Sequence, residues 1–182
     1  MSETLSRHLN ALGALAVSLV LLFAFYSQFV DGDLPCPLCL LQRIGFVAVL
    51  MGLCANVVFG PHPKHYAMMI IGALIGGAIA LRQVALHVIP GTPFYGDAFF
   101  GYHFYTWAFI VFGIIIFGSA IIMSFGEQYQ HDVSSTFAEQ SPFLKFSVAV
   151  VFVVILLNLL STFAECGPLV CPDNPTEYWL FS

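Results

Sequence analysis

The chain has 182 residues, of which 59% are hydrophobic and 8% are charged, and its formal net charge is −5. A soluble globular domain carries about a quarter charged residues, so this composition indicates a membrane protein and excludes a large soluble domain. The sequence contains no basic run, so it gives no support for binding to nucleic acid or for polybasic binding to acidic lipid headgroups.

Five apolar stretches are each long enough to cross roughly 30 Å of hydrocarbon as a helix. In chain order they cover residues 11–30, 40–59, 67–86, 104–123 and 143–163. The first exceeds the usual length of a signal-peptide core and no small-residue cleavage site follows it, so we interpret it as a retained helix. The sequence predicts an all-α membrane protein with a four-helix transmembrane bundle in residues 1–125. Residues 126–182 then supply a cytoplasmic link, a fifth transmembrane helix and a tail.

The few basic residues predict the orientation of these helices. Arg7, Lys64 and Lys145 fall on one side if the helices alternate in direction, and the excess of Lys and Arg in short loops marks the cytoplasmic side. The opposite side is predicted to hold only acidic charges, namely Asp31, Asp33, Asp97, Glu165, Asp173 and Glu177. We therefore expect a cytoplasmic N-terminus and an external C-terminus.

Four of the five cysteines fall on the predicted outer side. Cys36 and Cys39 lie in the first outer loop, and Cys166 and Cys171 lie in the tail after the fifth helix. Disulfides persist in the periplasm and are reduced in the cytosol, so two closely spaced pairs on this side indicate thiol–disulfide chemistry. Cys54 lies in the middle of a predicted helix, where we expect a small core residue.

The first cysteine pair is followed by a basic residue inside a span. Cys39 is predicted to begin the second helix, where unpaired amides and the helix dipole favour a thiolate. Arg43 lies one helical turn further on, and its fixed charge would stabilise the same anion. A basic residue inside a span is rare and tends to mark function. The alternative is an arginine that extends to the membrane surface above a structural disulfide.

Polar residues of the third helix are predicted to lie at the depth of Arg43, because the second and third helices run in opposite directions. Arg82, Gln83 and His87 would then join Arg43 as groups that hold the carbonyl oxygens of a lipid-soluble quinone between apolar walls. In the alternative interpretation Arg82 extends to the membrane surface, and Gln83 and His87 cap or bridge helices.

The segment Leu-Pro-Cys-Pro-Leu-Cys-Leu-Leu-Gln-Arg at residues 34–43, between the first two predicted helices, resembles the signature of the DsbB family of quinone-dependent disulfide oxidases. The resemblance covers residues 9–125. It implies a redox-active Cys36–Cys39 disulfide that passes electrons to ubiquinone or menaquinone beside Arg43, in the bacterial inner membrane. It also implies a periplasmic DsbA-like partner of thioredoxin fold.

Two features depart from the pattern of that family. Its second cysteine pair usually lies between the third and fourth helices, but residues 88–103 contain no cysteine. Gln83 stands where the family often has a histidine thought to contact quinone, although glutamine also donates hydrogen bonds.

Three interpretations of Cys166 and Cys171 remain open. A shuttle disulfide, which oxidises a soluble partner and is reoxidised by Cys36–Cys39, is favoured because the Gly-Pro segment between them suits an accessible, mobile loop. A structural disulfide in the tail is the second interpretation. The third is a zinc site built from four cysteines, which an oxidising compartment disfavours.

The sequence thus predicts a membrane thiol–disulfide oxidoreductase with four catalytic cysteines, Cys36, Cys39, Cys166 and Cys171. Cys36 would be the exchange cysteine and Cys39 the donor of electrons to quinone. One alternative is an enzyme like vitamin K epoxide reductase, in which the C-x-x-C would precede a late helix. The other is a transporter or assembly factor with structural disulfides, which the absence of charges through the middle of the spans disfavours.

Overall fold

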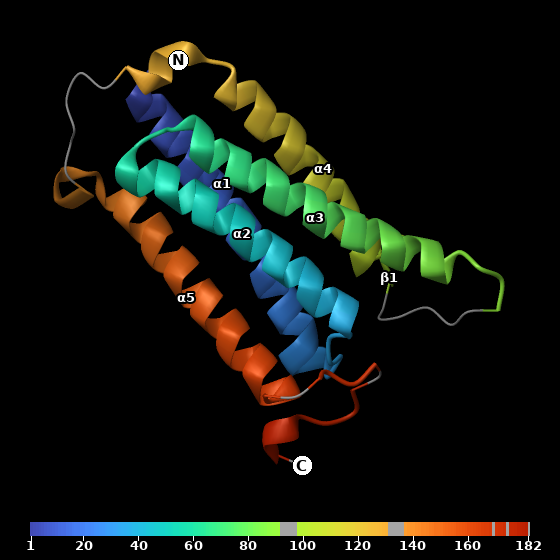
Figure 1. Ribbon diagram of the computed structural model, residues 1–182. Helices are drawn as coiled ribbons and strands as arrows, with labels where there is room; N and C mark the ends of the chain where they lie inside the picture. Colours follow the sequence, from blue (N-terminus) through green and yellow to red (C-terminus); the bar gives the residue numbers. More distant parts are fainter. Residues whose placement is uncertain (92–97, 131–136, 169, 174, 182) are drawn as a thin grey trace.

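The computed structural model describes residues 1–91, 98–130, 137–168, 170–173 and 175–181, and its architecture is five long helices (Figure 1). They are α1 (Glu3–Tyr26), α2 (Pro37–Phe59), α3 (Pro63–His87), α4 (Phe104–Met123) and α5 (Pro142–Cys166). Each is apolar and long enough to cross a membrane. The predicted all-α, multi-pass membrane fold is confirmed.

Short elements connect and end these helices. A π-helical turn, η1 (Ser27–Asp31), extends α1, and two residue pairs form an antiparallel hairpin, β1 (Ala98–Phe99) with β2 (Tyr102–His103), before α4. Three 3-10 turns follow α4 or end the chain: η2 (Gly126–Tyr129), η3 (Phe137–Glu139) and η4 (Trp179–Phe181).

The first helix begins earlier than its apolar stretch predicts. Ser2 caps it by accepting a hydrogen bond from Leu5 N at 3.3 Å. The buried Arg7 guanidinium pairs with Glu3 at 2.7 Å and donates to the carbonyl oxygen of Val57 at 2.6 Å. Because this charge is paired and hydrogen-bonded inside the bundle, the helix continues through the polar start of the chain.

In the bundle, α3 packs against α2 and α4, and α1 packs against α2 and α5. Small residues allow the closest approaches: a Cβ built on Gly45 of α2 would lie 2.9 Å from the Cα of Gly76 in α3. The rings of Phe46 and Phe112 stack at 4.0 Å in the core beside them. Close backbone approach and aromatic packing therefore hold α2, α3 and α4 together.

A buried polar cluster joins α1, α2, α3 and η2 at the end of the bundle that holds residue 1. We call it the tyrosine cluster, and it consists of Ser6, Asn10, Asn56, Tyr66 and Gln128. The Tyr66 hydroxyl lies 3.0 Å from Ser6 Oγ, accepts from Asn10 Nδ2 at 2.9 Å and donates to Gln128 Oε1 at 2.9 Å. Asn56 Nδ2 donates to Asn10 Oδ1 at 3.0 Å. These bonds fix the register of the helices.

The opposite end of the bundle holds both cysteine pairs, and we call it the cysteine end. Figure 1 shows the C-terminal tail beside the loop between α1 and α2, where Gln28 Nε2 donates to the hydroxyl of Tyr178 at 3.2 Å. Glu165 was predicted on the same side as Cys166, and it lies at this end, in the last turn of α5, with 2% of it exposed. Cys166 was predicted in the tail after the fifth helix, and this is wrong, because α5 continues to Cys166. Asp97 lies outside the described residues.

Candidate active site

The Cys36–Cys39 disulfide is built into the first turn of α2. Cys36 is the N-cap residue, and its sulfur accepts a hydrogen bond from Cys39 N at 3.2 Å. Pro37 suits the first helical position because it has no N–H to leave unpaired and its φ is already helical. Cys39 follows within the same turn, where free amides and the helix dipole favour negative charge on its sulfur.

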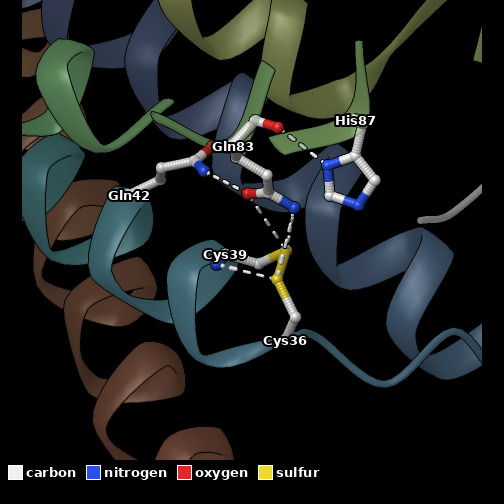
Figure 2. The surroundings of a disulfide bond; sticks show 5 residues. All are labelled: Cys36, Cys39, Gln42, Gln83 and His87. Atoms are coloured by element: carbon white, nitrogen blue, oxygen red, sulfur yellow. Dashed lines mark hydrogen bonds between the residues drawn. A yellow bond between two sulfur atoms is a disulfide. The ribbon is translucent and has the colours of Figure 1, made fainter. Parts of the chain in front are cut away.

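A glutamine of α3 contacts both sulfurs of this disulfide (Figure 2). Gln83 Nε2 lies 3.3 Å from Cys36 Sγ and 3.6 Å from Cys39 Sγ. Its Oε1 accepts from Gln42 Nε2 at 2.6 Å, so the carbonyl is occupied and the NH₂ group faces the sulfurs. The sequence predicted that Gln83 contacts a quinone, whereas the structure adds a contact to sulfur. Such a donor stabilises charge that develops on sulfur when the disulfide opens.

An apolar cavity of about 720 Å³ opens beside Cys39. Its walls come from α1, α2, α4 and residues 33–35, with aromatic rings that include Phe23, Phe46, Phe104, Tyr105 and Trp107. Cys39, Gln42, Arg43 and Gln83 are the polar groups that α2 and α3 contribute to the wall. A cavity of this size with few convergent donors is typical of a site for a small, largely apolar ring compound.

Arg43 is held inside the bundle. Only 9% of it is exposed, and its guanidinium lies over the ring of Phe25 at 5.1 Å. Nη1 donates to Gln28 Oε1 at 2.6 Å, and Nη2 donates to the carbonyl oxygen of Ala24 at 3.1 Å. The side chain is therefore a fixed positive charge in the cavity wall, one helical turn beyond Cys39, rather than one that extends to the membrane surface.

Two other predicted ligand contacts lie away from the cavity. Arg82 is exposed on α3, and neither it nor His87 belongs to the cavity wall among the described residues. His87 Nδ1 lies 2.7 Å from the backbone oxygen of Gln83, and its ring stacks on Tyr105 at 5.1 Å. His87 thus touches two residues of the wall, Gln83 and Tyr105.

The second disulfide joins Cys166, the last residue of α5, to Cys171 in the tail. Gly167 turns the chain with a φ of 60°, and a Cβ there would lie 2.5 Å from the ring of Trp179. Cys166 is buried and Cys171 is half-buried. The tail therefore folds back over the end of α5 and keeps this disulfide at the cysteine end.

Sequence reasoning missed several polar residues around the first disulfide. Gln42 belongs to the motif itself but had no assigned role. Gln28 and Ser161 lie in apolar spans, where buried polar side chains mark helix contacts or sites, and this signal was available. Glu165 was predicted only as an acidic charge on the outer side, and no contact was predicted for Tyr178. Their contacts depend on tertiary structure.

The site thus combines a C-x-x-C disulfide, a buried arginine and an adjoining apolar cavity within an apolar helical bundle. The comparisons identify the family. Residues 6–97, half of the chain, match the family described as Disulfide bond formation protein DsbB, and the chain belongs to this family.

Relatives in the family match less than half of the chain. Disulfide bond formation protein B of Aromatoleum aromaticum is 37% identical over 84 residues, which cover 43% of this chain and 51% of that protein. The Xanthomonas euvesicatoria protein of the same name is 38% identical over 84 residues, covering 43% and 49%. Disulfide bond formation protein B 1 of Pseudomonas aeruginosa is 35% identical over 88 residues, covering 46% and 54%. The match thus spans about half of each relative. No solved structure matches.

Proposed function

We propose that this protein is a thiol:quinone oxidoreductase of the bacterial inner membrane. It reoxidises a periplasmic DsbA-like protein of thioredoxin fold and passes the electrons to ubiquinone or menaquinone, which supports disulfide bond formation in other proteins. One observation carries the proposal: Cys39 and Arg43 lie together in the wall of an apolar cavity of about 720 Å³.

The residues of the cavity fit a quinone. Its aromatic and aliphatic walls suit a lipid-soluble ring, and the Arg43 guanidinium and the Gln42 amide are donors for carbonyl oxygens. A bound quinone supplies the oxidant: it accepts the two electrons and two protons that a dithiol loses when it closes to a disulfide. This chain's part is to bind the ring beside Cys39 and to stabilise charge on sulfur.

The two cysteines of the motif have different surroundings, which supports different roles. Cys39 belongs to the cavity wall and is the proposed donor of electrons, stabilised as a thiolate by the helix start, Gln83 and Arg43. Cys36 lies outside the wall and is the proposed exchange cysteine. Because only 7% of Cys36 is exposed, exchange at its sulfur requires neighbouring residues to move apart.

The Cys166–Cys171 pair is the proposed shuttle. A thiolate of the soluble partner attacks this disulfide and forms a mixed disulfide, and the partner leaves oxidised. The resulting dithiol then reduces Cys36–Cys39 by a second two-electron exchange. Its place at the cysteine end and the partial exposure of Cys171 support this role.

Within the described residues no cluster of three metal-ligating side chains is present, and we do not propose zinc.

The proposed orientation places the cysteine end in the periplasm and the N-terminus in the cytoplasm. It is supported by Arg7, Lys64 and Lys145, which all belong to the opposite end of the bundle, at or near the starts of α1, α3 and α5. Disulfides would be maintained only on the oxidising side.

The proposal is tested with purified protein, a soluble quinone analogue and a reduced thioredoxin-fold dithiol protein. We expect quinol formation by the unaltered chain and none by Cys36→Ser or Cys39→Ser, because neither variant can form the disulfide. Cys54→Ser is the matched control, since this free cysteine packs in the core. Quinol formation by Cys39→Ser would contradict the proposal.

The role of the second pair is tested in the same assay. Cys166→Ser should block oxidation of the protein partner but leave turnover with a small dithiol, which reaches Cys36–Cys39 directly. Full oxidation of the protein partner by this variant would mean that the pair is structural.

A further inference from the structure

Arg43 is connected through Gln28 to polar residues that do not belong to the cavity wall. We call Arg43 and these residues the arginine cluster, and its other members are Gln28 of η1, Ser161 and Glu165 of α5, and Tyr178 of the tail. The fifth helix and the tail thus reach the charge that lies beside Cys39. The matched family segment, residues 6–97, contains only Gln28 and Arg43 of this cluster.

Gln28 connects Arg43 to α5 and to the tail. Its Oε1 accepts from Arg43 Nη1 at 2.6 Å and from Ser161 Oγ at 3.3 Å, while its Nε2 donates to Tyr178 at 3.2 Å. Both polar atoms of the buried amide are occupied, so its orientation is fixed with the carbonyl toward Arg43. The guanidinium is consequently held at one place in the wall.

Glu165 is the unexplained member of this cluster. It is 2% exposed, and neither carboxyl oxygen has a hydrogen-bond partner among the described residues. It lies one helical turn after Ser161, on the same face of α5, and the Ser161 hydroxyl and the Arg43 guanidinium both donate to Gln28 Oε1. A buried carboxylate without hydrogen bonds is costly, so its charge depends on the positive charge nearby.

We propose that Glu165 is the counter-charge of Arg43, and that it is a positioning residue which sets how strongly Arg43 stabilises a thiolate at Cys39. When Glu165 is ionised, it offsets the positive field of Arg43 at the sulfur. When Glu165 is protonated, the full field acts on Cys39. The positive charge of Arg43 therefore compensates the Glu165 carboxylate in one state and the Cys39 thiolate in the other.

This alternation balances charge during the exchange. Two electrons that enter the Cys36–Cys39 disulfide produce a thiol at Cys36, with one proton from the attacking dithiol, and a thiolate at Cys39. A second proton of that dithiol is taken up by Glu165. The net charge around Arg43 is then the same before and after reduction. Only the consequence for turnover rests on the proposed quinone activity, whereas the coupling of charges does not.

Other titratable groups face this part of the protein. Tyr178 lies on the arginine cluster, Asp33 lines the cavity and accepts from Ser27 Oγ at 3.4 Å, and His87 and Tyr105 stack beside Gln83. Asp33 is exposed, so water screens its charge. Glu165 differs from all of these because it is a buried acid without a hydrogen-bond partner in the described residues.

The test is a titration of the Cys39 thiolate by its ultraviolet absorbance, in full-length protein that carries Cys36→Ser and Cys54→Ser. The same chain with Cys39→Ser provides the baseline. We expect Glu165→Gln to lower the pH midpoint by about half a unit to one unit, because the offsetting charge is gone. Glu165→Asp should keep the parent midpoint. Glu177→Gln, in the exposed part of the tail, is the matched control and should also keep it.

A double-variant comparison separates charge coupling from a packing effect. In an Arg43→Gln background, Glu165→Gln should no longer lower the midpoint, because a buried carboxyl group without Arg43 beside it stays protonated and carries no charge for the substitution to remove. The proposal would be overturned if Glu165→Gln left the pH midpoint unchanged or raised it. It would also be overturned if Glu165→Gln lowered the midpoint equally in the Arg43→Gln background.

A second measurement avoids dependence on the stability of a variant. Infrared difference spectra of the unaltered chain should gain a carboxylic-acid carbonyl band when Cys36–Cys39 is reduced, and Glu165→Asp should shift that band. No gain of such a band would overturn the proposal. Neither measurement uses quinone or a protein partner, so a positive result with no quinol formation would reject the proposed function alone.

Discussion

The two buried polar clusters of this bundle differ in charge and in completeness. In the tyrosine cluster the side chains are neutral, and the Tyr66 hydroxyl has three partners at 2.9–3.0 Å. The arginine cluster contains a cation and an acid, and Glu165 has no hydrogen-bond partner in the described part of the chain. A satisfied neutral network stabilises one arrangement, whereas an incompletely paired charged network responds when charge nearby changes. We therefore expect substitutions in the tyrosine cluster to change stability and substitutions in the arginine cluster to change reactivity.

We expect the largest effect on reactivity from Arg43→Gln, which tests the role of the arginine cluster. The variant loses the positive charge beside Cys39 and the bond to Gln28, and we expect quinol formation to fall by about 10- to 100-fold. Initial rates at saturating dithiol measure this. Arg82→Gln, which makes the same replacement at an exposed arginine of α3, is the matched control. A rate within twofold of the unaltered chain would show that the arginine cluster does not support reactivity.

A smaller effect is expected for Gln83→Leu. The variant removes the NH₂ group that lies 3.3 Å from Cys36 Sγ and leaves a similar volume. One hydrogen bond to sulfur contributes about 1 kcal/mol, so reduction of the disulfide by a small dithiol should slow by about fivefold. Stopped-flow measurement without quinone isolates this step. An unchanged rate would mean that the contact to sulfur has no role in exchange.

The tyrosine cluster should respond in stability rather than in rate. Tyr66→Phe removes a hydroxyl with three buried partners, and we expect the free energy of unfolding to fall by about 1–3 kcal/mol. Thermal denaturation in detergent measures the loss, and quinol formation by the folded fraction should stay within about twofold of the unaltered chain. A tenfold lower rate of quinol formation by fully folded Tyr66→Phe would contradict a purely structural role for the tyrosine cluster.

The smallest effect is expected for Arg82→Gln by itself. Its side chain is exposed and lies outside the cavity wall, so neither the Michaelis constant for quinone nor the maximal rate should change by more than about twofold. Steady-state kinetics with varied quinone provide the measurement. A clearly raised Michaelis constant would support the quinone contact that the sequence predicted for Arg82.

Local features of the sequence determined the helices and the first disulfide site. The predicted span 104–123 coincides with α4, and the other four spans lie within or overlap their helices. Apolar length is sufficient for this, because a helix is the only way for a single segment to satisfy its backbone in hydrocarbon. The sequence also placed Cys39 at the start of the second helix, and it lies in the first turn of α2, whereas the capping role of Cys36 was seen only in the structure.

Only the tertiary structure decided which polar residues meet. The sequence placed Arg43, Arg82, Gln83 and His87 at one depth, but the cavity wall includes only Arg43 and Gln83 of these. Glu165, expected only as an acidic charge on the outer side, lies buried in the last turn of α5, one turn after Ser161, whose hydroxyl donates to Gln28 Oε1. Depth follows from counting residues along a helix, whereas the direction of a side chain depends on how the helix is rotated about its axis. Helices that are apolar on all sides carry little signal for that rotation, and contacts such as Gly45 against Gly76 set it.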